Sequence, residues 1–339
     1  MKIALFNVTN LVDNNPGCRA TISGLKKAIG EDIVYQFPMG MGYHYFQQKE
    51  NLFFKKTDTF NNAYLKLKKN KDYERFIVTS DVIIINSEGT IHSNSIGAKT
   101  LLAFAKLSKE YRKKVFLVNG SYFNLNEELI DIIRSCDKVY VREIKSYDYL
   151  LKSNVKSFLV PDCAFLTEFK FASIKHNKCL YTPGVVFSYG EKKEDVDVNS
   201  ILFSHYEIIR KKYRTPVFLL IEEKERVLAN KWIEYGGDVI DSTKLSINNL
   251  LTRISEFENM ISGRYHILLF ALMCQVRTVP LSSNTFKILG LYETFSTDID
   301  IFLQDSLNPK IDINQTLLLD VDLDAIRERI LLSYKELFN

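Results

Sequence analysis

Short apolar runs alternate with amphipathic segments along most of this 339-residue chain, and this alternation restricts the possible folds more than any other feature. Strands that alternate with helices at such spacing form crossover units in a parallel sheet. The first half of the sequence therefore predicts an α/β domain. Its expected strands are residues 2–8, 32–37, 81–86, 114–119, 138–142 and 155–160, with helices near 18–29, 96–110, 126–135 and 143–152.

The alternation lapses from Phe165 to Pro183, which predicts a linker, and it resumes with an apolar run at 184–189. Chains of this length exceed the usual size of one core, so two domains are expected. We predict two Rossmann-like α/β domains that face a central cleft, over residues 1–168 and 169–320. Apolar residues at helical spacing predict a closing amphipathic helix in 321–339. The later strands are expected at 184–189, 216–221, 238–240, 258–261 and 276–280.

Composition narrows the class of partner. There are 45 basic and 41 acidic residues, a net charge of +4, which suits anionic small ligands and argues against nucleic acid. The five cysteines contain no Cys-x-x-Cys pair, so they are expected to be reduced core thiols, and no metal site is predicted. The N-terminal residues enter a strand pattern directly, and no run has the roughly 18 apolar residues of a membrane span. These features predict a cytoplasmic protein; they do not predict its oligomeric state.

Polar residues gather where the predicted strands of the first domain end, and open α/β sheets bind ligands at such ends. The loop after the first strand contains Gly17 but no Gly-x-Gly-x-x-Gly, so no dinucleotide site is predicted. After the third strand, Glu88 and His92 are candidates for acid/base or hydroxyl-binding groups. Helix capping and turn formation by Thr90, Ser93 and Asn94 is the alternative explanation of that cluster.

Residues 256–290 carry the sharpest signal. A strand is predicted to end at Ile261, Ser262 and Gly263 to form a turn, and Arg264, Tyr265 and His266 to begin a helix. A helix N-terminus favours an anion, and an arginine adds bidentate recognition of phosphate or carboxylate. His266 adds a group that exchanges a proton near neutral pH. The alternative is a surface ion pair and a helix cap.

The segment from Tyr43 to Lys71 is rich in aromatic residues and lysine. Aromatic rings cover the apolar faces of sugars, and lysines attract anionic lipid. One interpretation is therefore a flap that faces an acceptor sugar or the inner face of a membrane, as a peripheral contact. The other is an ordinary solvated helix pair.

Taken in order, the strand-end clusters resemble the polysaccharide pyruvyl transferase family. The most specific part is Ser262-Gly-Arg-Tyr-His266 with the following Ser283-Asn-Thr-Phe-Lys287. The resemblance covers about residues 1–295. Three earlier segments complete it: Asn86-Ser-Glu-Gly-Thr-Ile-His92, Val141-Arg-Glu-Ile-Lys-Ser146 and Val160-Pro-Asp162.

The resemblance implies a fold like that of B-type glycosyltransferases and transfer of a pyruvyl group from phosphoenolpyruvate to sugar hydroxyls as a ketal. It implies a bacterial cell-surface polysaccharide, or its lipid-linked precursor, as acceptor and no bound cofactor. His266 would be the catalytic acid, with Glu88 or His92 as the base. The donor would meet Arg264, Arg142, Ser262, Gly263, Ser283, Asn284, Thr285 and Lys287, and the acceptor Asn15, Gly17, Asn86 and Asp162.

Two departures from the family pattern keep other functions open. The early Asn-x-Gly-Asp element is Asn15-Pro-Gly-Cys18 here, and a glycine triplet is replaced by Ser87-Glu-Gly89. A second interpretation keeps the fold and uses a nucleotide-activated, perhaps acidic, sugar as donor, held around 182–189 and Glu222-Glu223. A third is an inactive carbohydrate-binding scaffold.

Overall fold

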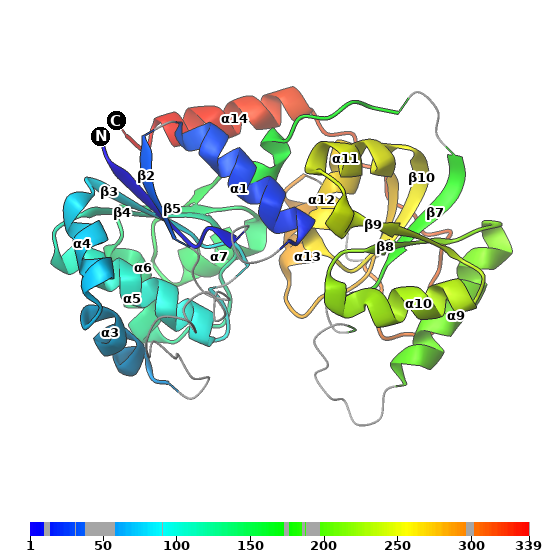
Figure 1. Ribbon diagram of the computed structural model, residues 1–339, viewed down its shortest axis with the longest axis horizontal. Coiled ribbons are helices and arrows are strands. Elements are labelled where there is room, and N and C mark those ends of the chain that lie inside the picture. Colours follow the sequence, from blue (N-terminus) through cyan, green and yellow to red (C-terminus); the bar gives the residue numbers. More distant parts are fainter. Residues whose placement is uncertain are drawn as a thin grey trace. The chain divides into compact units, whose positions relative to one another are not determined.

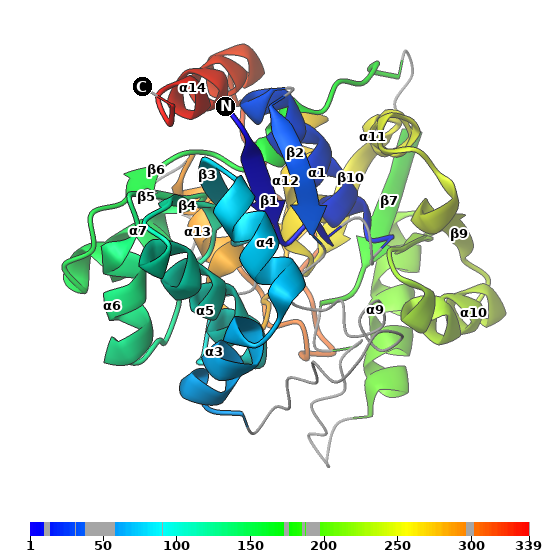
Figure 2. The same cartoon turned by 60° about the vertical axis from the view of Figure 1, so that its left-hand side comes forward.

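A computed structural model of the chain has two parallel sheets with helices on their faces, which confirms the predicted α/β class (Figures 1 and 2). The chain divides into two compact units. Unit 1 comprises Met1–Asp13, Thr21–Leu166 and Asp324–Asn339, and unit 2 comprises Asn14–Ala20 and Thr167–Leu323. The structure describes residues 1–9, 14–30, 32–37, 58–89, 91–172, 176–184, 187, 197–295 and 302–338.

This division differs from the expected one in two details. The closing helix, which we expected as a separate segment, belongs to unit 1, and residues 14–20 belong to unit 2 although they lie early in the chain. The main change of unit falls at Leu166–Thr167, close to the expected position.

Unit 1 is built on a six-stranded parallel sheet in the order β2-β1-β3-β4-β5-β6. Its central strands are fully buried, as in β3 with its sequence Val-Ile-Ile-Ile-Asn. In Figure 1, α14 lies over one face of the sheet, and α5 and α6 lie over the other. The strands are β1 Ile3–Phe6, β2 Ile33–Phe37, β3 Val82–Asn86, β4 Lys114–Gly120, β5 Lys138–Val141 and β6 Phe158–Leu159. The helices are α1 Pro16–Ile29, α3 Phe60–Lys68, α4 Lys71–Thr79, α5 Ile96–Glu110, α6 Glu127–Ser135, α7 Ile144–Lys152 and α14 Leu323–Lys335.

The strand order of unit 1 reverses between β1 and β3. The chain runs outward from β1 to β2 on one side, and from β3 through β6 on the other. Such a reversal is where open α/β sheets form a crevice at the strand carboxyl ends. Asn7 and Asn86, at these two ends, are therefore well placed for a site.

Unit 2 has a five-stranded parallel sheet in the order β11-β10-β7-β8-β9. In Figure 1, α9 and α10 cover one face and α11 and α12 the other. The strands are β7 His176–Thr182, β8 Val217–Leu220, β9 Asp238–Asp241, β10 Phe257–Ser262 and β11 Arg277–Pro280. The helices are α9 Val198–Lys212, α10 Arg226–Glu234, α11 Ile247–Ser255, α12 Tyr265–Met273 and α13 Lys287–Glu293. Two short 3-10 turns, Glu223–Glu225 and Ser242–Lys244, follow β8 and β9.

The central strand of unit 2 corrects one prediction. We expected a linker over residues 165–183, but β7 lies inside it, at His176–Thr182; of the strand expected at 184–189, only residues 184 and 187 belong to the described part of the chain. The first three residues of β7 are polar and exposed, so its pattern does not resemble a buried strand. Pro183 lacks the N–H that a central ladder needs, which ends the strand before the apolar run begins.

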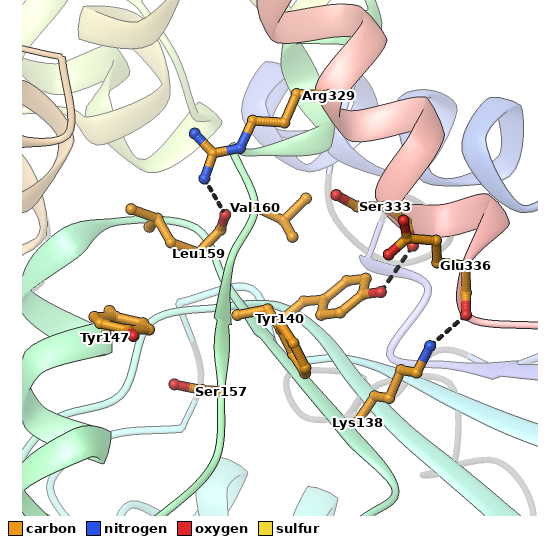
Figure 3. A pocket seen from close by; sticks show the side chains of 10 residues that line it. Lys138, Tyr140, Tyr147, Ser157, Leu159, Val160, Arg329, Ser333 and Glu336 are labelled. Carbon is orange, nitrogen blue, oxygen red and sulfur yellow. Dashed lines mark hydrogen bonds between the residues drawn. The ribbon is translucent and has the colours of Figure 1, made fainter.

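The last helix is fastened to the edge of the unit 1 sheet, beside a pocket of about 410 Å³ (Figure 3). The Tyr140 hydroxyl donates to the carbonyl of Ser333 (2.7 Å), and Lys138 donates to the carbonyl of Glu336. In the opposite direction, the Arg329 guanidinium of α14 donates a hydrogen bond to the carbonyl oxygen of Leu159 in β6 at 2.6 Å. Strand β5 thus satisfies carbonyls that the end of α14 leaves without helical partners. None of the predicted site residues lines this pocket.

Three smaller expectations concern surface and composition. Residues 43–57 lie outside the described part of the chain, and the remainder of that segment forms α3 and the start of α4. Within the described ranges, no helix is long and apolar enough to cross a bilayer. Three cysteines are buried as expected, whereas Cys18 and Cys136 are only partly buried.

Candidate functional site

The turn between β10 and α12 has the predicted form. β10 ends at Ser262, Arg264 is the N-cap residue of α12, and the Arg264 amide donates to the Ser262 hydroxyl at 3.0 Å. Gly263 is required here, because a Cβ would lie 2.4 Å from the Cα of Gly184 in the loop after β7. The strand ends of β7 and β10 therefore approach each other closely at the start of α12.

The Arg264 side chain is buried against two carboxylates. One of its terminal nitrogens donates a hydrogen bond to Oε1 of Glu225, and the other lies 3.6 Å from Oε1 of Glu222. Glu225 is 0% exposed, and its second oxygen accepts from the amides of Ile221 (3.1 Å) and Glu222 (3.3 Å). A buried arginine with a hydrogen-bonded carboxylate is a fixed ion pair.

Sequence reasoning missed Glu225 and named Glu222 only for the nucleotide-sugar alternative. The local signal was weak, because the spacing of Glu222 and Glu225 is that of a capping box but the first residue of that motif is normally Ser or Thr. The structure contains this box: each of the two glutamates bonds to the backbone of the other.

His266 lies against the segment Asn14–Ala20. A Cβ on Gly17 would lie 2.2 Å from Nδ1 of His266, so glycine leaves room for the imidazole. The side-chain Nδ2 of Asn15 donates to Oε1 of Glu222 at 2.8 Å. The side-chain Oδ1 of Asn15 accepts from the backbone amide of Gly17 at 2.8 Å. Asn15 and Gly17, predicted on the acceptor side, thus lie in unit 2 with Arg264 and His266.

The same segment is tied to the 3-10 turn after β9. Arg19 donates to the carbonyls of Leu245 (2.8 Å) and Ser242 (3.0 Å), and Asn14 donates to the carbonyl of Thr243 at 2.9 Å. These bonds hold the start of α1 on unit 2.

The predicted donor residues 283–287 follow β11, the neighbour of β10 in the sheet. Ser262 pairs with Pro280, and the Leu281 amide donates to the Ser262 carbonyl at 2.8 Å. Asn284 is exposed, whereas Ser283, Thr285 and Lys287 are partly buried. The Asn284 side-chain oxygen accepts from Ser283 (3.2 Å) and Lys287 (3.5 Å). This segment therefore lies at the strand end next to the Arg264 turn.

Unit 1 has its own strand-end cluster, at the β1/β3 reversal. The Asn7 side chain donates to the carbonyl of Asn86 (2.6 Å), and the Asn86 side chain donates to the carbonyl of Asn7 (3.2 Å). Asn7 adopts a positive φ of 62° to make this reciprocal contact. Glu88 is buried, and its Oε2 accepts from Thr9 (3.1 Å) and Asn86 (3.4 Å). Two predicted site residues, Asn86 and Glu88, are thereby brought together.

Arg142 and Asp162 form a buried ion pair in the same unit, at 2.9 Å. Arg142 also donates to Ser121 at 2.9 Å, and Asp162 accepts from Thr21 at 3.2 Å. A Cβ on Gly89 would lie 3.5 Å from the Arg142 guanidinium, so Arg142 lies near the loop that carries Glu88. One terminal nitrogen of Arg142 makes the ion pair with Asp162, and its Nε makes the bond to Ser121.

The neighbouring Glu143 has a structural role at the start of α7. Its carboxylate accepts from the amide and the hydroxyl of Ser146. Burial raises the pKa of Glu143 to about 7, although these bonds and Arg142 act in the opposite direction.

His92 is partly exposed, and its backbone bridges to Phe123. Beside it, Asn94 accepts from the amide of Asn126 (2.8 Å), and Ser95 caps α5 through the amide of Ala98 (3.1 Å). Capping and turn contacts therefore account for Asn94, as the alternative interpretation proposed; Thr90 lies outside the described residues.

Comparisons with known proteins bear on the whole chain. A family model described as "Polysaccharide pyruvyl transferase" matches residues 15–285. A search of curated proteins finds no match.

Solved structures with a similar fold include three enzymes titled UDP-N-acetylglucosamine 2-epimerase or UDP-GlcNAc 2-epimerase. The one from Methanocaldococcus jannaschii has a TM-score of 0.54 at 14% identity and covers 98% of this chain and 93% of its own. The one from Rickettsia bellii has a TM-score of 0.54 at 10% identity and covers 99% of this chain and 95% of its own. The one from Neisseria meningitidis, bound to UDP-GlcNAc, has a TM-score of 0.50 at 11% identity and covers 100% of this chain and 94% of its own. These likenesses support the predicted fold of B-type glycosyltransferases.

Proposed function

Because the chain belongs to the polysaccharide pyruvyl transferase family, we propose that it moves a pyruvyl group from phosphoenolpyruvate to two hydroxyls of a saccharide, as a cyclic ketal. The acceptor is a cell-surface polysaccharide or its lipid-linked precursor. The observation that carries this proposal is the turn that presents Arg264 and His266 together at the N-terminus of α12.

The donor requires a positive site, because phosphoenolpyruvate carries about three negative charges. The start of α12 offers backbone N–H groups and the positive end of a helix dipole. Arg264 adds a planar fork suited to phosphate or carboxylate. Lys287, which follows the neighbouring strand β11, is a predicted addition to this charge.

In the proposed reaction, His266 as imidazolium donates a proton to the methylene carbon of the donor. The carbon that carries the phosphate then gains oxocarbenium character, and an acceptor hydroxyl oxygen attacks it. A general base accepts the proton of that hydroxyl. The second hydroxyl attacks as the carbon–oxygen bond to phosphate breaks, and its proton leaves with the phosphate. The proton that the base takes from the first acceptor hydroxyl thus balances the proton that His266 gives to the methylene carbon, which becomes the methyl group of the ketal.

Replacement of His266 by alanine tests the proposal. General acid catalysis is typically worth about 10² to 10⁴ in rate, so His266→Ala should lower kcat by that factor. The measurement is release of inorganic phosphate from phosphoenolpyruvate with a saccharide acceptor. His176→Ala is the control, because His176 is exposed at the start of β7. Full activity of His266→Ala would contradict the proposed role.

A nucleotide-activated sugar is the second candidate donor. The fold neighbours include an epimerase bound to UDP-GlcNAc, and the partly exposed Glu222 carboxylate is suited to accepting hydroxyl hydrogen bonds. Thermal unfolding with phosphoenolpyruvate and with a panel of nucleotide sugars separates the two. Stabilisation by phosphoenolpyruvate alone supports pyruvyl transfer, and stabilisation by a nucleotide sugar alone supports the alternative. Stabilisation by neither would favour a scaffold that no longer binds a donor.

A further inference from the structure

Two carboxylates face the Arg264 guanidinium, but they are held in different ways. Glu225 is fixed: it is 0% exposed, bonds directly to Arg264, and accepts two backbone amides with its other oxygen. Removing it from Arg264 would leave a buried charge without its partner, which is strongly unfavourable. Glu225 is therefore a permanent counter-ion of Arg264.

Glu222 makes a looser contact with the same guanidinium. Its Oε1 lies 3.6 Å from the nearest Arg264 nitrogen, beyond normal hydrogen-bond distance. The side chain of Glu222 is 11% exposed, and it has three further partners: the Asn15 side-chain amide at 2.8 Å, the ammonium of Lys224 and the backbone amide of Glu225. These three contacts, and not the distant Arg264 guanidinium, supply the hydrogen bonds of the Glu222 carboxylate.

The charge state of Glu222 follows from these neighbours. Burial acts to raise the pKa of Glu222, but the charge of Arg264 and the hydrogen bond and charge of Lys224 together hold it below its ordinary value. The carboxylate is therefore ionised at neutral pH. It faces the terminal nitrogen of Arg264 that does not bond to Glu225.

We propose that Glu222 occupies the anion position of Arg264 whenever no donor is bound and determines how tightly that position accepts a phosphate or carboxylate group. An incoming anion takes the place of Glu222 at Arg264, and Glu222 remains bonded to Asn15 and Lys224. This inference rests on the proposed function, which assigns Arg264 to the donor. It adds Glu222 as the residue that sets the affinity of the donor site.

The expected size of the effect follows from electrostatics. A bound anion would lie within a few ångströms of the ionised Glu222, and unit charges at that distance repel each other substantially in a partly buried site. Loss of the Glu222 charge should therefore tighten anion binding by about tenfold. A glutamine at this position keeps the shape and can still accept from Asn15.

The test compares Glu222→Gln with a matched control on the same turn. Glu223→Gln removes an equal charge one residue away, but Glu223 is 71% exposed and pairs with Arg226. Calorimetric titration with phosphoenolpyruvate and with inorganic phosphate should show about tenfold tighter binding by Glu222→Gln. Glu223→Gln and Glu222→Asp, which keeps the charge, should bind like the unmodified protein. Partial unfolding does not imitate this result, because it weakens binding.

A further variant separates the inference from the function on which it rests. Arg264→Met should abolish binding of both anions in protein whose circular dichroism spectrum matches that of the unmodified protein. If it does, and Glu222→Gln binds no more tightly than the unmodified protein, the role of Glu222 is wrong and the donor site stands. If Arg264→Met leaves both affinities unchanged, Arg264 is not the donor site, and both the proposed function and this inference are contradicted.

Discussion

At the scale of single residues, Gly17 and His266 constrain each other. Gly17 is the second residue of α1, where an alanine would ordinarily favour the helix by up to about 1 kcal/mol. Here a Cβ would lie 2.2 Å from Nδ1 of His266. Glycine at position 17 therefore leaves room for the imidazole of His266, although it does not favour the helix.

This contact gives a prediction for Gly17→Ala. The new methyl group should displace the imidazole, so both the free energy of unfolding and the turnover should fall. In the Gly17→Ala/His266→Ala double variant the clash is absent, and the same alanine should be neutral or stabilising relative to His266→Ala alone. Denaturant unfolding of the four proteins measures the coupling. Equal effects of Gly17→Ala with and without the imidazole would show that the two residues do not interact.

His205, buried in unit 2, predicts a pH dependence of stability. Its Nε2 donates to the carbonyl of Asn308 (2.7 Å), which can only accept, so Nδ1 accepts from the Tyr181 hydroxyl (2.9 Å). Burial lowers the pKa of His205 from its ordinary value of 6.5, although the bond to Asn308 acts in the opposite direction. The folded protein thus favours the neutral ring, which is the form that this geometry needs.

The unfolded chain takes up a proton at His205 as the pH falls below 6.5, before the folded chain does. The stabilising contribution is therefore complete above that pH and is lost as the pH decreases, by at most about 1.4 kcal/mol per pH unit. In urea unfolding between pH 7 and 5, His205→Gln should show a shallower loss than the unmodified protein. His176→Gln, at an exposed position, should follow the unmodified curve. Parallel curves for all three proteins would contradict the assignment.

At the scale of elements, α14 shows how the end of the chain contributes to the core of unit 1. Ile326, Ile330 and Tyr334 are buried, and the ring of Tyr334 lies edge-on to Tyr140 with 5.6 Å between centroids. Truncation of a large buried ring typically costs about 3–5 kcal/mol. Tyr334→Ala should lower the free energy of unfolding by about that amount.

Leu332 provides the control for this prediction, because it lies on the same helix but is 53% exposed. Leu332→Ala should change stability by less than about 0.5 kcal/mol. Similar losses for both variants, measured by chemical denaturation, would show that the whole helix and not the buried face sets the effect.

Elements also show where sequence reasoning succeeds and where it stops. Amphipathic or fully apolar segments such as α5, β3 and β10–α12 were predicted within a few residues, because their periodicity reflects their own burial. β7 was not predicted, because its first three residues are polar and exposed. Glu225 was missed because its importance comes from a partner 39 residues away, Arg264, which local patterns do not show. The proximity of Asn15 to Glu222 likewise depends on contacts across more than 200 residues of sequence.

At the scale of the molecule, α1 is shared by the two units. Its first residues belong to unit 2 and those from Thr21 onward to unit 1. Arg19 is the main tie on the unit 2 side, through the carbonyls of Ser242 and Leu245. Local stability along one helix should therefore depend on two separate sets of contacts.

Replacement of Arg19 by methionine should reveal this division. Methionine keeps much of the apolar stem but cannot donate to either carbonyl. Amide hydrogen exchange should become faster at residues 17–20, while amides 24–29 should keep their protection. The control is Lys27→Met, near the end of the helix on the unit 1 side. Uniform acceleration along α1 in Arg19→Met would show that the helix opens as a single cooperative segment.

The shared helix also affects how chimeras of this family should be cut. A crossover at Leu166–Thr167 takes residues 167–323 of unit 2 from one parent, but Asn14–Ala20, which also belong to unit 2, come from the other parent. In such a chimera, Glu222 and His266 come from one parent, whereas their contact residues Asn15 and Gly17 come from the other. Grafts that carry this heptapeptide along with the second unit should retain the donor chemistry more often than grafts made at the single obvious junction.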